Sequence, residues 1–123
     1  MKQLRLLQIV PNLESGGVER GTIDLSNHLA KKGCENFIIS NGGKLLTLIY
    51  RQNVTHINLP VHSKNPITII KNIKKIRRII KKNKINIINV RSRAPAWSAY
   101  YASKNICTSI ATFHNVYGHN NLF

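Results

Sequence analysis

Short apolar runs alternate with segments of helical periodicity along the whole chain. Residues 4–10 are mostly apolar, as expected of a short strand that is covered on both faces. Further runs predict strands at residues 37–40, 54–59, 85–90 and 108–113. Apolar residues at helical spacing predict helices over residues 18–32, 66–84 and 95–102, with a shorter helix at 44–51.

The spacing also indicates which face of each longer helix is buried. In the helix over 18–32, the positions expected to face the core are Val18, Thr22, Leu25 and Leu29, with Ala30 nearby. In the helix over 66–84 they are Ile69, Ile73, Ile76 and Ile80, supported by Ile70 and Ile79. The turn Asn41-Gly42-Gly43 ends the second strand.

This order of elements predicts the fold class. Strands that alternate with helices form βαβ units, which pair their strands in parallel and place helices on the faces of the sheet. The sequence therefore predicts an α/β protein with a doubly wound parallel sheet. Its 123 residues suffice for one domain, and no repeat or low-complexity linker divides them.

The chain is strongly basic. Nineteen Lys and Arg residues against four Asp and Glu residues give a formal net charge of +15. Such a balance favours anionic partners, which include nucleic acid, anionic lipid and phosphorylated substrates. A biased genome composition is an alternative explanation, because Asn, Ile and Lys are all abundant.

Several other classes of protein are disfavoured. No apolar run approaches the roughly 20 residues of a membrane span, and the run at 4–10 is too short for a secretory signal. We therefore expect a cytoplasmic protein. Neither the two cysteines, Cys34 and Cys107, nor the five histidines show metal-ligand spacing, so no metal site is expected.

A polar turn with two glycines, Gly16 and Gly17, joins the first strand to the first helix. Glycine lacks a Cβ atom, so a ligand can approach the backbone closely there. The free N–H groups at the start of the helix would face that ligand, with the positive end of the helix dipole behind them. This arrangement suits a phosphate, although an ordinary strand-to-helix turn explains the same residues equally well.

Two more polar segments are expected near this turn, because ligands of open α/β sheets bind at the carboxyl ends of the strands. Arg91 and Arg93 follow the fourth strand, and His114 and Asn115 follow the fifth. Arginine pairs with phosphate through its forked donors, and histidine can bond a sugar or phosphate or move a proton. The alternatives are a solvated arginine pair and an incidental loop histidine.

Two familiar kinds of enzyme site do not match the sequence. A nicotinamide-dinucleotide site needs Gly-x-Gly-x-x-Gly and an acidic residue after the second strand. Here the glycines are adjacent, and Ser40-Asn41-Gly42 offers no carboxylate. A hydrolase triad is also disfavoured, because the chain has no Gly-x-Ser-x-Gly elbow.

The helix over 66–84 carries a basic face that no acidic residue interrupts. Such a face can lie on anionic lipid or hold nucleic acid phosphates, and a solvated outer face is the simplest alternative. The chain has no recognisable nucleic-acid-binding motif and few aromatic residues, so no specific nucleic acid is expected. The basic residues are Lys71, Lys74, Lys75, Arg77, Arg78, Lys81 and Lys82.

Three segments in combination resemble bacterial glycosyltransferases of family 4. The turn Gly16-Gly17-Val18-Glu19 is shared widely in that family. Residues 91–97, Arg-Ser-Arg-Ala-Pro-Ala-Trp, suggest a narrower subgroup of envelope-polysaccharide enzymes. Residues 112–118 look like the end of the family's next strand, which usually reads Thr-x-His-Gly.

The resemblance implies a GT-B architecture, in which two Rossmann-like domains face each other across a cleft. Residues 1–123 match only the N-terminal, acceptor-side domain, as if truncated. By this likeness, Gly16 and Gly17 would approach the diphosphate of a nucleotide-sugar donor. His114 would line the cleft near the transferred sugar as the catalytic residue, and Arg91 and Arg93 would lie at its mouth.

The resemblance also implies partners and a location. Such enzymes use no cofactor or metal as a rule. They often work at the inner face of the cytoplasmic membrane on lipid-linked or polysaccharide acceptors, which would give the basic helix a purpose.

Two departures from the family pattern limit the expected activity. Asn115 replaces the usual glycine, which would narrow the cleft. In this family the residues that bind the donor nucleotide belong to the second domain, and residues 1–123 do not include that domain. Half a cleft cannot exclude water or hold a donor in register, so the chain alone is expected to be inactive unless a separate donor-domain chain completes it.

Overall fold

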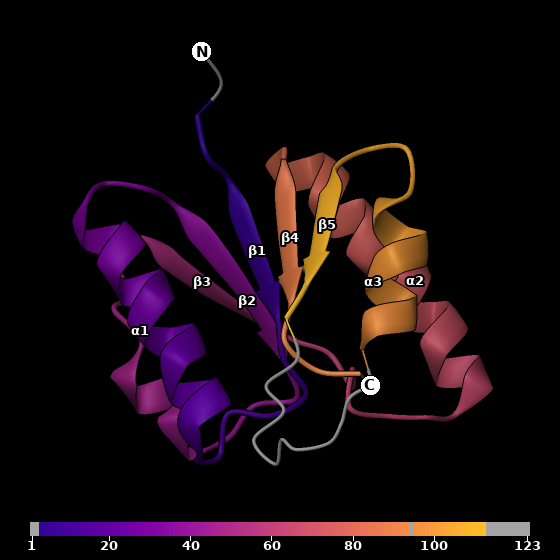
Figure 1. The fold of residues 1–123 in the computed structure, drawn as a ribbon, viewed down its shortest axis with the longest axis horizontal. Coiled ribbons are helices and arrows are strands. Elements are labelled where there is room, and N and C mark those ends of the chain that lie inside the picture. Colours follow the sequence, from indigo (N-terminus) through magenta and orange to yellow (C-terminus); the bar gives the residue numbers. More distant parts are fainter. Residues whose placement is uncertain (1–2, 94, 113–123) are drawn as a thin grey trace.

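A five-stranded parallel sheet with helices on both faces forms the part of the chain described by this computed structural model, residues 3–93 and 95–112 (Figure 1). The strands are β1 (Leu6–Ile9), β2 (Asn36–Ser40), β3 (Val54–Asn58), β4 (Ile87–Val90) and β5 (Thr108–Ala111). The helices are α1 (Gly17–Lys31), α2 (Pro66–Asn83) and α3 (Ala96–Ser103), with a short 3-10 helix η1 (Lys44–Leu48).

The strand order is β3-β2-β1-β4-β5. The chain runs outward from the centre to β3, returns across the sheet through α2, and then builds the other half. This is a Rossmann-like, doubly wound arrangement, so the predicted fold class is confirmed. The predicted helix at 44–51 is a 3-10 helix that ends at Leu48.

The central strand β1 is buried on both faces, as predicted. It pairs with β2 from Leu7 opposite Phe37 to Ile9 opposite Ile39, and with β4 along its whole length. Because side chains alternate along a strand, Leu7 and Ile9 pack in the core beneath α2 and α3, whereas Gln8 points toward α1. Figure 1 shows α1 on one side of the sheet and α2 and α3 on the other.

The buried face of α1 agrees with the prediction at Thr22 and Ala30 and differs from it at Leu25 and Leu29. Leu25 and Leu29 are only half-buried, and the fully buried positions are Thr22, Ile23, Ser26 and Ala30. The physical reason is Gln8, whose Nε2 donates to the carbonyl of Thr22 at 2.9 Å and to Oγ of Ser26 at 2.8 Å. A buried amide without partners costs about 1–3 kcal/mol, so small polar residues face the sheet there.

The buried face of α2 is also narrower than predicted. Ile76 and Ile80 are buried in the core, but Ile70 is 55% exposed and does not support the apolar stripe. Asn72 is buried instead, and its Nδ2 donates to the carbonyl of Pro60 at 3.1 Å. A polar side chain can occupy this position because the loop after β3 supplies its partner.

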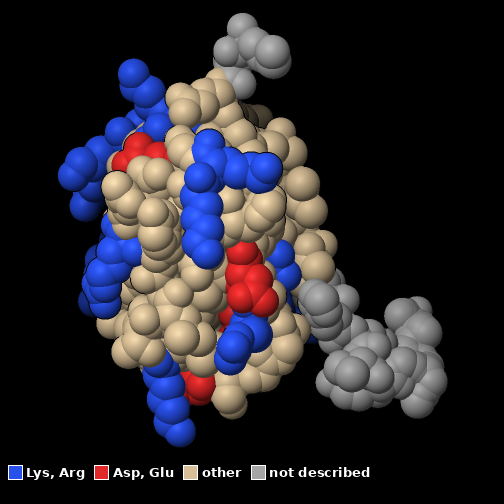
Figure 2. Space-filling view, turned by 90° about the vertical axis from the view of Figure 1, so that its left-hand side faces the viewer, with Lys and Arg blue, Asp and Glu red and all other residues tan. Residues whose placement is uncertain are grey.

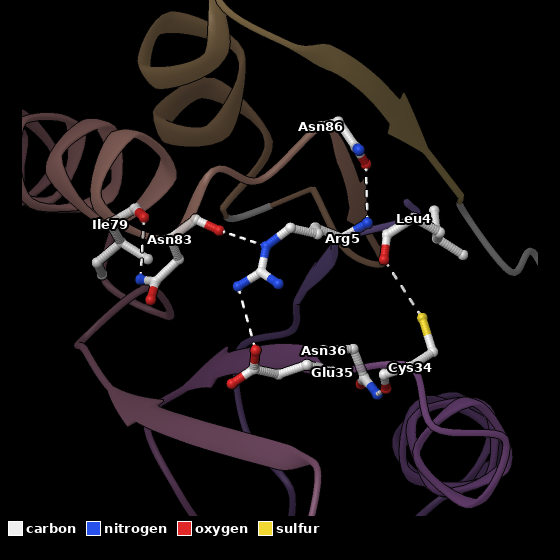
Figure 3. Close-up of polar contacts among 8 residues, drawn as sticks. All are labelled: Leu4, Arg5, Cys34, Glu35, Asn36, Ile79, Asn83 and Asn86. Carbon is white, nitrogen blue, oxygen red and sulfur yellow. Dashed lines mark hydrogen bonds and ion pairs between the residues drawn. The ribbon is translucent and has the colours of Figure 1, made fainter. Parts of the chain in front are cut away.

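Arg5 connects several elements at the amino ends of the strands (Figure 3). Its Nε donates to the carbonyl of Asn83, the last residue of α2, at 2.6 Å. Its guanidinium pairs with Glu35 at 3.3 Å and lies over the ring of Phe37, 5.6 Å from the centroid. Oδ1 of Asn86 accepts from the backbone N–H of Arg5 at 2.9 Å. One residue therefore joins the start of β1 to the end of α2 and to the segments that lead into β2 and β4.

We predict that Arg5→Met lowers the free energy of unfolding by about 2 kcal/mol, because it removes the charged donor from the last carbonyls of α2. The partly exposed ion pair with Glu35 contributes little of this. Urea denaturation monitored by circular dichroism measures the effect. Lys81→Met, which removes an exposed cation from the same end of α2, is the control and should change stability by less than about 0.5 kcal/mol. Equal losses in both variants would contradict this role of Arg5.

Candidate functional site

The loops that follow β1 and β2 are bonded to each other at the carboxyl edge of the sheet. The N–H of Leu13 donates to the carbonyl of Gly42 at 2.9 Å, and the N–H of Leu45 donates to the carbonyl of Leu13 at 2.8 Å. Gly43 has φ 148°, and a Cβ there would collide with the carbonyl oxygen of Leu13. The second glycine turn of the sequence therefore holds the first one in place.

Gly16 and Gly17 differ in what surrounds them. Gly16 is the N-cap of α1 with φ 110° and ψ 164°, a conformation that essentially only glycine adopts. A Cβ on Gly16 would lie 2.6 Å from Oε1 of Glu19, so a carboxylate of the same turn fills that space. A Cβ on Gly17 would meet no atom of the described residues within 4 Å. An anion at this turn would therefore bind on the Gly17 side, away from Glu19.

Arg91 reaches from the end of β4 across the sheet toward α1. Its Nε donates to Oε1 of Gln8 at 2.8 Å. Its Nη1 lies 3.9 Å from the place a Cβ on Gly21 would take. Burial lowers the pKa of Arg91, although arginine stays protonated at neutral pH. The structure therefore brings Arg91 to the first two turns of α1 and fixes its cation there.

Gln8 and Gly21 were not among the residues singled out from the sequence. Gln8 positions Arg91 and bonds α1, and Gly21 leaves room for the guanidinium. Each had a signal: Gln8 is a polar residue inside an apolar strand, and Gly21 is a glycine inside a predicted helix. Neither signal indicates that Arg91 is the neighbour of these residues, because Gln8 and Arg91 are 83 residues apart in the sequence.

Ser40, the last residue of β2, is hydrogen-bonded to His56 in the middle of β3. Oγ of Ser40 lies 2.6 Å from Nε2 of His56 and accepts from the N–H of Gly42 at 2.9 Å. Burial lowers the pKa of His56, which favours the neutral ring. Because Ser40 is fully buried, the pair supports the loop at Gly42 and is not placed to react with a ligand.

The remaining predicted residues of this edge are only partly described. Arg93 is exposed in the loop after β4. His114 and Asn115 lie outside the described residues, so their roles remain predictions. Among residues 3–93 and 95–112, no cluster of three His, Cys, Asp or Glu side chains could hold a metal ion. Within the same ranges, no helix has the length and apolar character to cross a membrane.

The basic residues of α2 lie on the opposite side of the sheet from α1. Arg77 does not belong to the exposed face to which it was assigned, because its Nη1 donates to the carbonyls of Ala102 and Lys104, both at 3.3 Å. Figure 2 shows that Lys and Arg side chains are also spread over the face on the α1 side. Positive charge is therefore not confined to α2. The exposed basic residues of α2 are Lys71, Lys74, Lys75, Arg78, Lys81 and Lys82.

The fold and this edge of the sheet together define a class of protein. A sequence model of Glycosyltransferase Family 4 matches residues 15–123, so the chain belongs to that family. The predicted resemblance is thereby confirmed.

Two solved structures resemble this chain, the first in sequence and fold and the second in fold alone. The glycosyltransferase from Rickettsia africae ESF-5 is 44% identical over 98% of this chain, with a TM-score of 0.82. MurG from Acinetobacter baumannii is 14% identical over 95% of the chain with a TM-score of 0.71, a likeness that shows the fold alone. The chain spans 32% of the first structure and 37% of the second. No curated protein matched the sequence.

The contrast between the two glycines gives a stability prediction. Gly16→Ala should lower the free energy of unfolding by about 1–3 kcal/mol, because alanine is strained at this φ and ψ. Gly17→Ala should leave it unchanged or raise it by up to about 1 kcal/mol, because Gly17 begins α1 and its neighbourhood is open. Urea titration of both variants measures the difference, and equal losses would show that the turn has another conformation.

Proposed function

We propose that this chain forms the acceptor-side half of the cleft of a glycosyltransferase, which moves a sugar from a nucleotide-sugar donor to a lipid-linked or polysaccharide acceptor in envelope glycan synthesis. One observation carries the proposal. The guanidinium of Arg91, fixed by Gln8, lies beside the first turns of α1, whose N-terminus is open on the Gly17 side. Membership of family 4 and the 44% identity to the Rickettsia africae glycosyltransferase support it.

In this proposal the donor diphosphate lies against the start of α1. The N–H groups near Gly17 and the helix dipole attract its oxygens, and Arg91 adds a charge-assisted hydrogen bond. The carboxylate of Glu19 repels the diphosphate from the Gly16 side and so restricts it to one position. By the family resemblance, His114 faces the transferred sugar, and Arg93 and Asn115 lie at the rim of the cleft.

We expect the 123-residue chain to show no sugar transfer on its own, because one half of a cleft cannot hold the donor away from water. A separate donor-domain chain would be needed to restore transfer. Assays of the purified chain with UDP- and GDP-sugars and a lipid-linked acceptor test this expectation, and turnover would contradict it.

Binding of inorganic pyrophosphate tests the anion site directly. We predict that Gly17→Ala and Arg91→Gln each weaken binding by about tenfold, since one charged hydrogen bond or one steric block costs about 1.4 kcal/mol or more. Titration of each ¹⁵N-labelled protein, followed at the amide of residue 17, measures the affinity. Arg51→Gln is the matched control, because it removes the same charge from the loop that leads into β3 at the other end of the sheet. Equal weakening of pyrophosphate binding in all three variants would show that the net charge of the chain attracts the anion, and it would contradict a specific site at Gly17.

A second candidate function, binding to an anionic membrane, is favoured by the surface of α2. Ile67 and Ile70 are 66% and 55% exposed, and Lys71 and Lys74 follow them four positions later on the same faces of the helix. Exposed apolar side chains can enter the headgroup region while the lysines meet lipid phosphates, at about 1 kcal/mol per cation. A protein that binds in this way would be peripheral at the inner face of the cytoplasmic membrane.

We predict that the chain sediments with vesicles that contain phosphatidylglycerol and not with vesicles of phosphatidylcholine alone. The double variant Ile67→Ser, Ile70→Ser should lose most of this binding. The variant Lys31→Gln, Lys32→Gln removes two exposed cations near the end of α1 and should retain it. If only the lysine variant loses binding, the attraction follows overall charge and α2 is not the membrane-binding surface.

A further inference from the structure

A pocket of about 420 Å³ lies at the amino ends of the strands, at the edge of the sheet opposite the Gly17 turn. Four segments line it: the residues before β1, the end of α2, the residues before β4 and the loop between α3 and β5. Small-molecule sites in proteins occupy about 300–1,000 Å³, so this pocket is large enough for a ligand. We name it the amino-edge pocket.

The lining of the amino-edge pocket combines cations with apolar side chains. Arg5, Lys81 and Lys84 contribute positive charge, and none of the described residues that line the pocket is acidic. Ile85 is 4% exposed and belongs to the core, and Ile106 packs against the same core. A ligand that fits this lining has an anionic group at one end and an apolar chain at the other.

The cation of Arg5 is held in place before any ligand binds. Its Nε donates to the carbonyl of Asn83, and its Nη2 lies 3.3 Å from Oε1 of Glu35 (Figure 3). A guanidinium has five N–H donors, and Nη1 of Arg5 bonds no other residue in the part of the chain that the structure describes. Donors therefore remain for a ligand, on a side chain whose position costs little further entropy to fix.

Lys84 has a backbone conformation that disfavours a side chain. It follows α2 with φ 54° and ψ 43°, the left-handed region in which glycine is the usual residue. A cation at this end of a helix is favourable for the dipole, but Lys81 and Lys82 in the last turn already provide that charge. The helix therefore does not explain a lysine here, and strained residues of this kind are typical of functional sites.

We propose that the amino-edge pocket binds an alkyl phosphate. The phosphate oxygens accept hydrogen bonds from Arg5, Lys81 and Lys84, and the alkyl chain lies against Ile85 and Ile106. The ligand is either a soluble alkyl phosphate or the headgroup end of an anionic lipid, which present the same chemistry to the pocket. The inference depends neither on sugar transfer nor on the exposed isoleucines of α2.

Calorimetric titration of the 123-residue chain with three probes tests the proposal. The probes are inorganic phosphate, butyl phosphate and octyl phosphate below its micelle concentration. Octyl phosphate should bind at least tenfold more tightly than butyl phosphate, because each buried methylene strengthens binding by up to about fourfold. Inorganic phosphate should bind most weakly, since it has no chain.

Substitutions at the end of α2 separate the pocket from overall charge. Lys81→Gln and Lys84→Gln should each weaken binding of octyl phosphate by about fivefold, because each removes a charged donor. Lys82→Gln is the matched control, because Lys82 is an exposed cation of the same turn that does not line the pocket. It should leave the affinity unchanged within about twofold.

Lys84→Gly separates binding from folding. Glycine relieves the left-handed backbone, so the melting temperature should rise by about 2–4 °C while binding of octyl phosphate weakens by about fivefold. A variant that is more stable and binds less well cannot have lost the ligand through unfolding.

Vesicles that contain phosphatidic acid distinguish the two sources of the ligand. If a lipid headgroup occupies the pocket, octyl phosphate should release the chain from these vesicles, and Lys84→Gln should weaken sedimentation more than Lys82→Gln does. If the ligand is a soluble alkyl phosphate, both variants should sediment alike while only Lys84→Gln weakens binding of octyl phosphate.

Three results would overturn the proposal. One is the absence of saturable binding of octyl phosphate. Another is equal affinity for octyl phosphate and inorganic phosphate, which would exclude a site for the chain. The third is equal weakening by Lys82→Gln and Lys84→Gln in the calorimetric titration, which would assign binding to the net charge of the chain.

Discussion

The structure depends on one polar side chain in the middle of its central strand. Gln8 is fully buried, and its amide must find partners on elements that come later in the chain. It donates to the carbonyl of Thr22 and the hydroxyl of Ser26, and it accepts from Arg91. These three bonds set the rotation of α1 and hold the guanidinium beside that helix. The core and the candidate site therefore share one constraint.

The two glycine turns, at Gly16–Gly17 and at Gly42–Gly43, are linked through the backbone of Leu13. Gly43 lets the loop after β2 approach the backbone of Leu13 closely, and this contact fixes the loop from which α1 starts. Backbone hydrogen bonds thus hold the loop that leads to the exposed turn at Gly17, and Gln8 holds the helix that follows it through Thr22 and Ser26. Such a turn needs little rearrangement to accept a ligand, which lowers the entropic cost of binding.

Hydrophobic pattern predicted the elements and fold class well, because period and turn signals are local properties of the sequence. It failed where a partner comes from a distant segment. Leu25 and Leu29 were predicted to face the core, but they are only half-buried, and Ser26 faces the sheet beside Thr22 because both residues are bonded to Gln8. Arg77 was predicted to belong to the basic face of the helix, but its guanidinium donates a hydrogen bond to the carbonyl of Ala102 near the end of α3. The Gly16–Gly17 turn could be predicted, whereas the role of Glu19 beside it depends on side-chain geometry.

The order of the strands has a consequence for how the chain folds during synthesis. Leu7 of β1 pairs with Phe37 of β2, but its other neighbour, Ile88 of β4, is made some eighty residues after β1. Parallel pairing over such separations is slow, because the loop must close before the contacts reward it. Until β4 arrives, one side of β1 lacks its strand partner and Gln8 lacks Arg91. The central strand β1, which is buried on both faces in the folded protein, is thus left without one of its two neighbours until β4 has been made.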